Sequence, residues 1–77
     1  MREIPEDLLS DVEKITSELI KYDNKDNLSW MKVYNDILNK LNMNNRKDKD
    51  ILLTNVVTMI TRYGYDIEIT PFKLKKY

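Results

Sequence analysis

The side chains that perform most enzyme chemistry are absent from this sequence. It contains no His and no Cys, so the usual general base, the thiolate nucleophile and the common zinc ligands are missing. Two carboxylate pairs remain, Asp11 with Glu18 and Asp66 with Glu68, but no surrounding apolar pattern would tune their pKa values for catalysis. The chain also lacks a glycine-rich phosphate loop and any metal-ligand spacing. We therefore expect a protein that is not an enzyme and that holds neither a cofactor nor a metal.

A second group of polar side chains could instead contact DNA. Lys and Arg bind phosphate oxygens, and Asn can form a bidentate contact with adenine. Side chains of these kinds lie opposite the apolar stripe of residues 30–41 or in the basic stretch after it, and the candidates are Ser29, Lys32, Asn35, Asn39, Lys40, Arg46 and Lys47. Asp36 shares the same outward face. The alternative interpretation is an ordinary solvated helix face that continues into a mixed-charge loop.

Charge is balanced overall but unevenly distributed. The net charge is zero, yet residues 1–30 carry eight acids and four bases, whereas residues 31–77 carry five acids and nine bases. This asymmetry is compatible with a nucleic-acid face on the second half. It is equally compatible with two halves, or two copies, that attract each other. The basic stretch 73–77 could likewise clamp phosphates or keep an edge strand soluble.

Apolar residues recur at helical spacing in three segments. The first runs over about 5–22 and opens with Pro5 and acids, which suit a helix N-terminus. The second has Ser29 as its N-cap and extends to about residue 41. The third, 51–63, is dense in β-branched residues, so a strand is the alternative. Its apolar face and the Gly64 at the C-cap position favour a helix.

After Gly64 the period changes to two, and this alternation predicts a half-buried strand over 65–70 that ends at Pro71. If 51–63 is a helix, the strand has no neighbour in its own chain to satisfy its N–H and C=O groups. Three partners stay open: a second copy across a two-fold axis, a strand of another protein, or residues 51–62 in a hairpin. The dimer or partner interface would contain Trp30, Tyr65, Ile67, Ile69 and Phe72.

These elements predict a mainly α fold, a single domain of residues 1–77 with three helices and one short C-terminal β-strand that pairs across a dimer. A chain this short buries only about 60% of its unfolded surface, and without disulfides or metals, association is a natural source of further stability. No segment approaches the roughly 20 apolar residues of a membrane span, so we expect a cytoplasmic protein with no membrane partner. The absence of Ala, beside eight Asn and ten Lys, is typical of an AT-rich genome or mobile element.

Residues 53–71, LTNVVTMITRYGYDIEITP, resemble the closing segment of Cro- and phage-repressor-type helix-turn-helix proteins, in which a last helix ends at an apolar-Gly-apolar step and leads into a strand. Residues 37–47, ILNKLNMNNRK, are similar to the end of that family's recognition helix and the basic loop after it. The resemblance covers roughly the C-terminal half. It implies that the second helix is the recognition helix, docked in the major groove. The long connection YDNKDNLS departs from the family's compact turn.

We therefore predict a small, dimeric, DNA-binding transcription regulator of helix-turn-helix type, carried by a phage or plasmid and bound to double-stranded DNA. The alternative is a small helical adaptor or inhibitor, such as an immunity or antitoxin protein, that acts on a host or toxin protein. It would bind through Trp30, Met31 and the C-terminal strand. Because Trp30 lies on the apolar stripe, we expect it to pack in a core or interface rather than to stack on bases.

Overall fold

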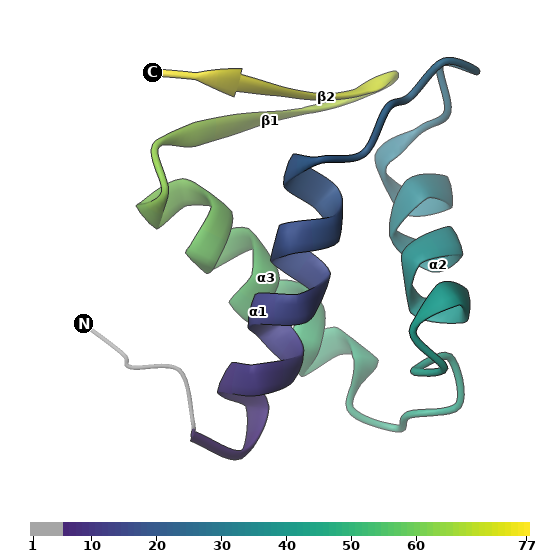
Figure 1. The fold of residues 1–77 in the computed structure, drawn as a ribbon, viewed down its shortest axis with the longest axis vertical. Helices are drawn as coiled ribbons and strands as arrows, with labels where there is room; N and C mark the ends of the chain where they lie inside the picture. The colour runs from purple at the N-terminus through teal and green to yellow at the C-terminus, as the bar shows by residue number, and fades with distance from the viewer. Residues whose placement is uncertain (1–5) are drawn as a thin grey trace.

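The computed structural model describes residues 6–77, and within that range the chain forms three helices followed by two strands (Figure 1). The elements are α1 (Glu6–Ile20), α2 (Trp30–Lys40), α3 (Lys49–Arg62), β1 (Tyr65–Ile69) and β2 (Phe72–Lys76). The predicted mainly α architecture with three helices is confirmed. The predicted start of the first helix, at residue 5, lies outside the described residues.

The helices pack together, and the strands close one end of the molecule. Figure 1 shows α1 crossing in front of α3, α2 beside α1, and the two strands lying over the ends of the helices. Side chains from the three helices and from β2 share one buried core, whose members with no exposed surface include Val12, Val33, Leu38, Val56 and Ile60. Burial of these apolar faces supplies the main driving force for the fold.

Capping groups at both ends define α2. The Ser29 hydroxyl accepts a hydrogen bond from the Lys32 N–H at 3.4 Å, as the sequence predicts for an N-cap. At the other end, Asn42 takes the left-handed conformation, with φ of 60°, and the Met43 N–H donates to the Leu38 carbonyl at 2.8 Å. This six-to-one hydrogen bond is that of a Schellman motif, which satisfies a carbonyl that the helix leaves open.

Residues 49–62 form a helix, so the helical interpretation of this β-branched segment is confirmed. The polar side chains on its outer face donate to carbonyls four residues back, including Thr54 to Asp50 at 3.1 Å and Asn55 to Ile51 at 2.8 Å. Such bonds satisfy hydroxyl and amide groups that would otherwise compete with the helix backbone. After Arg62 the chain turns at Gly64, whose φ of +89° is costly for any residue with a Cβ.

The structure corrects the prediction of a strand without an intrachain neighbour. β1 pairs antiparallel with β2, with Ile67 opposite Leu74 and Ile69 opposite Phe72, so the stretch expected to be a basic tail is the missing partner. Pro71 ends the first strand as predicted. It lies with Thr70 in the tight turn of the hairpin, and the peptide bond between them is cis, as in a type VI turn. Pairing across a dimer is therefore not needed to complete β1.

Two backbone hydrogen bonds at the ends of the hairpin show which residues of β2 face β1. The Tyr77 N–H donates to the Gly64 carbonyl at 2.8 Å, whereas the Phe72 N–H points away from β1 and donates to the Leu28 carbonyl at 2.8 Å. In an antiparallel pair, every second residue faces its partner strand. Lys73 and Lys75 therefore exchange hydrogen bonds with β1, and the N–H and C=O groups of Leu74 point outward along the free edge of β2.

The aromatic residues predicted for an interface lie partly inside this chain. Trp30 and Phe72 are buried, with 7% and 4% of their surfaces exposed, and their ring centroids are 5.4 Å apart. Tyr65 and Ile67 are half-buried and pack against the core, whereas Ile69 is 61% exposed. Trp30 packs in the core, one of the two places that its position on the apolar stripe predicts, although the sequence also predicts it at an interface. Phe72 is likewise a core residue, a correction to its predicted place in an interface, because the hairpin folds back onto the first turn of α2.

The connection between α1 and α2, residues 21–29, is organised by one side chain. The Asn24 amide nitrogen donates to the Leu28 carbonyl at 2.9 Å and to the Phe72 carbonyl at 3.0 Å, while its oxygen accepts from the Leu28 N–H at 2.9 Å. The Phe72 N–H in turn donates to Leu28. Asn24 therefore closes its own loop and attaches that loop to the start of β2.

Candidate functional site

The predicted DNA-contact residues on α2 lie on its exposed face. Lys32, Asn35, Asn39 and Lys40 are exposed, and Ser29 is half-buried with its hydroxyl used as the N-cap. Lys32 forms an ion pair with Asp36 one turn away, with 3.6 Å between the Lys32 nitrogen and a carboxylate oxygen. The Asn39 side chain accepts a hydrogen bond from Asn44.

Lys40 contacts a second helix. Its ammonium group donates to the Glu18 carboxylate on α1, and Lys21 contacts the same carboxylate at 2.9 Å. The hydrogen bond from Lys40, with that from Lys21, lowers the pKa of Glu18. Glu18 on α1 thus offsets the charge of Lys40, the basic residue in the last turn of α2.

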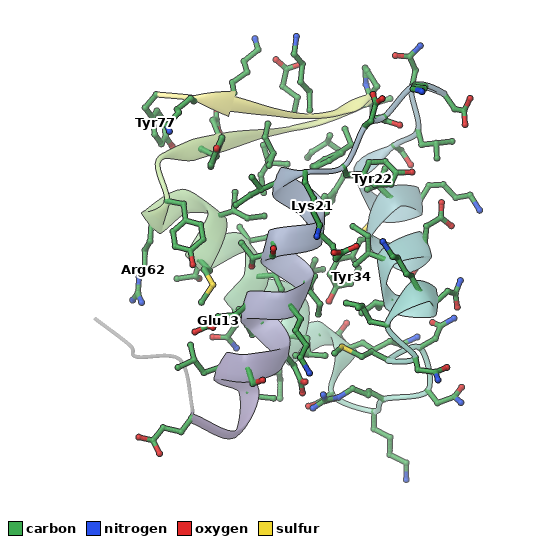
Figure 2. All side chains as sticks on the ribbon, viewed as in Figure 1. Glu13, Lys21, Tyr22, Tyr34, Arg62 and Tyr77 are labelled. Carbon is green, nitrogen blue, oxygen red and sulfur yellow. The ribbon has the colours of Figure 1, made fainter. Side chains whose placement is uncertain are left out.

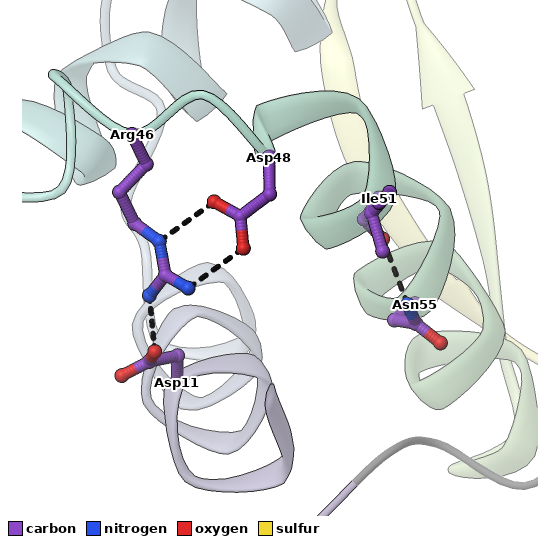
Figure 3. Close-up of polar contacts among 5 residues, drawn as sticks. All are labelled: Asp11, Arg46, Asp48, Ile51 and Asn55. Atoms are coloured by element: carbon purple, nitrogen blue, oxygen red, sulfur yellow. Dashed lines mark hydrogen bonds and ion pairs between the residues drawn. The ribbon is translucent and has the colours of Figure 1, made fainter. Parts of the chain in front are cut away.

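Arg46 lies at the centre of a three-residue ion cluster (Figure 3). Its guanidinium group donates two parallel hydrogen bonds to Asp48, from Nε at 2.8 Å and from Nη2 at 2.7 Å, and a third to Asp11 on α1. These bonds raise the pKa of Arg46, and the hydrogen bond from Arg46 lowers the pKa of Asp48. The planar guanidinium suits this bidentate geometry. Asp48 and Asp11 thus accept from three of the five N–H groups of Arg46.

The same cluster explains how α3 begins. Asp48 occupies the N-cap position of α3, yet its carboxylate makes no capping hydrogen bond. Arg46 holds that carboxylate instead, as Figure 3 shows beside the first turns of α3. Lys47, the neighbour of Arg46, is exposed, and its side chain makes no ion pair within residues 6–77.

The connections between helices differ from a compact helix-turn-helix. Residues 21–29 join α1 to α2, and residues 41–48 join α2 to α3. A helix-turn-helix motif joins its two helices through a turn of about three or four residues. Both connections here are at least twice as long.

The backbones of three tyrosines lie close together where α3 joins the hairpin, and we call Tyr63, Tyr65 and Tyr77 the tyrosine junction. Tyr63 and Tyr65 flank Gly64, and the Tyr77 N–H donates to the Gly64 carbonyl. The backbones of all three tyrosines therefore lie beside one hydrogen bond. The Tyr63 and Tyr77 side chains are 52% and 81% exposed. The Tyr65 ring lies under the Lys76 ammonium, 5.5 Å from its centroid. Figure 2 shows Tyr77 at the end of the hairpin, on the same side of the molecule as Arg62.

A groove of about 390 Å³ lies at the other end of the hairpin. The C-terminal end of α1, the following loop and β2 form its walls, and the residues that line it include Leu19, Ile20, Tyr22, Asn24, Phe72, Lys73 and Leu74. Apolar side chains such as Leu19 and Phe72 and polar side chains such as Asn24 and Lys73 both line it. The free edge of β2 opens onto it at Leu74. We call this feature the β2 groove.

Sequence reasoning missed Asn24, the tyrosine junction and the β2 groove. Asn24 contacts residue 72 across 48 positions, and such a side-chain contact leaves no periodic signal in the sequence. The spacing of Tyr63, Tyr65 and Tyr77 becomes meaningful only when β2 returns beside Gly64. A second alternation, Phe72 and Leu74 between lysines, could have revealed β2.

Within residues 6–77, no helix is long and apolar enough to cross a membrane. The described side chains likewise include no group of three or more acids that could hold a metal ion. Comparison with known proteins gives no assignment: no family model, no curated protein and no solved structure matches this chain.

Proposed function

We propose that this protein is a small protein-binding domain, an adaptor or inhibitor that acts by contacting another protein through the tyrosine junction. The exposure of Tyr63 and Tyr77 at the end of the hairpin where the chain returns to Gly64 carries the proposal. Tyrosine combines a large apolar ring with a polar hydroxyl, and it is enriched among the residues that dominate protein interfaces. The hydrogen bond from the Tyr77 N–H to the Gly64 carbonyl holds the backbone of Tyr77 beside the start of β1.

The charges on α2 support a protein partner more than a phosphate backbone. Lys32, Lys40 and Arg46 each have an acidic partner in the same chain. Each of these acids offsets part of the positive charge that would attract a phosphate. A protein partner does not depend on that positive charge, since its contacts are largely apolar and hydrogen bonded at the centre of the interface.

The proposal is tested by quantitative affinity capture from the cells that make this protein, with chemical cross-linking before lysis. The test variant carries Tyr63→Ala and Tyr77→Ala, and the matched control carries Ile51→Ala, which removes an exposed apolar side chain at the opposite end of α3. We expect one protein to be captured by the wild type and by the control but lost from the double variant. Equal capture by all three, or no enriched protein, would reject the proposal.

A second candidate is the predicted DNA-binding regulator of helix-turn-helix type, because the outward face of α2 presents Lys32, Asn35 and Asn39 to solvent. It is tested by titrating a mixed-sequence duplex at several salt concentrations. A regulator with several phosphate contacts would bind at low salt and lose affinity steeply between about 50 and 200 mM. Lys32→Glu should then weaken binding, whereas Glu13→Gln should not. No binding at low salt would exclude this candidate.

A further inference from the structure

The free edge of β2 is partly occupied by the protein's own loop. At Phe72, the outward N–H donates to Leu28 and the outward carbonyl accepts from Asn24. The next outward groups on this edge belong to Leu74 and Lys76, since residues 73 and 75 face β1. The loop thus satisfies one position of the edge and then turns away. The ladder could continue from Leu74 if another strand supplied the partners.

The β2 groove lies where that continuation would run. Leu74 and Phe72 line it from the strand side, while Leu19 and Ile20 line it from the end of α1. An extended peptide along the edge would place alternate side chains toward these apolar lining residues. The remaining side chains would lie on the outer face of the hairpin, beside Lys73 and Lys75.

The outer face of the hairpin indicates the charge of such a peptide. β1 presents Asp66 and Glu68 there, and β2 presents the lysines opposite them, Lys75 and Lys73. Lys75 pairs with Glu68 at 2.5 Å, whereas Lys73 forms no ion pair within the described residues. A third strand with acids opposite the lysines would extend the alternation of acid and base across the sheet, and opposite charges on neighbouring strands stabilise pairing.

The same charges disfavour a second copy paired strand to identical strand. Two β2 strands related by a two-fold axis at Leu74 would place Lys73 opposite Lys75. Two β1 strands related at Ile67 would place Asp66 opposite Glu68. Like charges directly opposite each other destabilise a sheet.

We infer that the edge of β2 binds an extended segment of a partner protein in which acidic and apolar residues alternate. The segment adds a third strand beside Leu74 and Lys76, sets its apolar side chains in the β2 groove and its acids beside Lys73. This inference deepens the proposed protein-binding function and rests on it for the existence of a partner. Its site is separate from the tyrosine junction.

The probe is a synthetic peptide, Thr-Asp-Val-Glu-Val-Asp-Thr, titrated into ¹⁵N-labelled protein and followed by NMR. The matched control peptide has Lys at each acidic position. With the acidic peptide we expect shift changes and slower hydrogen exchange at the amides of Leu74 and Lys76, and with the control peptide we expect neither. An acidic peptide that is N-methylated on alternate residues, so that its donors to β2 are blocked, should also fail to bind.

Protein variants test the same edge. Lys73→Glu should weaken binding of the acidic peptide about tenfold, while Lys47→Glu, which changes net charge equally at a distant loop, should not. Leu74→Pro removes an outward N–H donor from the edge of β2 and should therefore abolish peptide binding. The variant should still fold, because proline is tolerated at outward positions of edge strands. Should that variant fail to fold, Lys73→Glu and the N-methylated peptide still decide the matter.

Several results would overturn the inference: no shift changes at Leu74 and Lys76, equal binding of the basic peptide, or unaltered affinity in Lys73→Glu. A concentration-dependent mass of the protein alone that is lost in Leu74→Pro would assign the edge to a second copy and overturn it as well. The Tyr63→Ala and Tyr77→Ala variant should keep its peptide affinity. Failure of the peptide to bind, together with the expected pattern of partner capture, therefore rejects this inference alone. Equal partner capture by the wild type and the double tyrosine variant, with peptide binding retained, rejects only the role of the tyrosine junction.

Discussion

The ring of Trp30, at the start of α2, lies 5.4 Å from the ring of Phe72, at the start of β2, with 34° between the ring planes. Tyr34 packs against the same indole at 5.5 Å, and Tyr22 meets Phe72 edge-on at 6.4 Å. This aromatic group joins the hairpin to the helices. It is the apolar counterpart of the hydrogen bonds that Asn24 makes nearby.

Replacing Phe72 by Ala should therefore loosen the hairpin from the helices. We expect the free energy of unfolding to fall by about 3–5 kcal/mol, a large part of the roughly 5–15 kcal/mol of a typical domain. Because Trp30 is the single tryptophan, its fluorescence reports the change directly in a urea titration. Phe72→Leu should cost less, since it leaves a smaller cavity. Equal stability of Phe72→Ala and wild type would show that the ring contact is unimportant.

Asn24→Ala should destabilise the loop that precedes α2. It leaves the Leu28 N–H and the Phe72 carbonyl without a partner, whereas the Leu28 carbonyl keeps the hydrogen bond from the Phe72 N–H. At about 0.5–1.5 kcal/mol for each of these two unpaired groups, we expect a loss of roughly 1–3 kcal/mol in chemical denaturation. Asn24→Asp keeps the acceptor but not the donors, and it should also destabilise. Lys25→Ala, at an exposed neighbouring position, is the control and should have no effect.

The ionisation of Tyr34 should make the free energy of unfolding depend on pH in the alkaline range. Its side chain is 2% exposed between the helices (Figure 2), and burial, with the nearby Asp48 charge, raises its pKa to about 12. Below about pH 10 the tyrosine is neutral in both the folded and unfolded states, so its own contribution to stability does not depend on pH there. Between about pH 10 and 12 only the unfolded state ionises, so the free energy of unfolding should fall.

Tyr34→Phe should abolish that part of the alkaline loss, which we expect to be roughly 2–3 kcal/mol. At neutral pH the same variant should be as stable as the wild type or slightly more stable. The reason is that the Tyr34 hydroxyl is buried without a hydrogen-bond partner among the described residues. Tyr63→Phe, at an exposed position, is the control. Identical pH profiles for Tyr34→Phe and the wild type would contradict the expected role of burial.

Arg46 should act as a structural residue rather than a phosphate ligand. Arg46→Gln removes the contacts to Asp11 and Asp48, and we expect a lower Tm, whereas Lys47→Gln should leave Tm unaltered. The pKa of Asp48 is lowered in the folded state, so this contribution is present above about pH 4 and is lost as pH falls through the folded pKa. Arg46→Gln should accordingly weaken the acid dependence of Tm. A normal Tm together with weakened duplex binding would favour the regulator instead.

The sequence predicted the helices well because each buries one face, and that requirement imposes a period of 3.6 on the residues. The Ser29 cap and the Gly64 turn were predictable because each depends on the residue type at a single position next to a helix end. β2 was not recognised, because five residues with three lysines resemble a solvated tail and Pro71 suggested an end rather than a turn. That error created the apparent need for a second chain beside β1.

The candidate sites were less predictable because they depend on contacts between distant residues. Lys40 and Arg46 look available for phosphate in the sequence, and only the packing of α1 brings Glu18 and Asp11 to them. The expected DNA-contact roles of Ser29, Lys32, Asn35, Asn39 and Lys47 stay predictions. The tyrosine junction exists only because the hairpin returns the chain to Gly64.

The Asn24 bridge also bears on how the protein is made. During synthesis, residues 21–29 leave the ribosome well before Phe72, so the loop must wait for a partner that is translated 48 positions later. Until then, Trp30 lacks the ring that covers it and offers an apolar surface to chaperones or to neighbouring nascent chains. A translational pause between the codons for α3 and β2 would prolong that vulnerable interval.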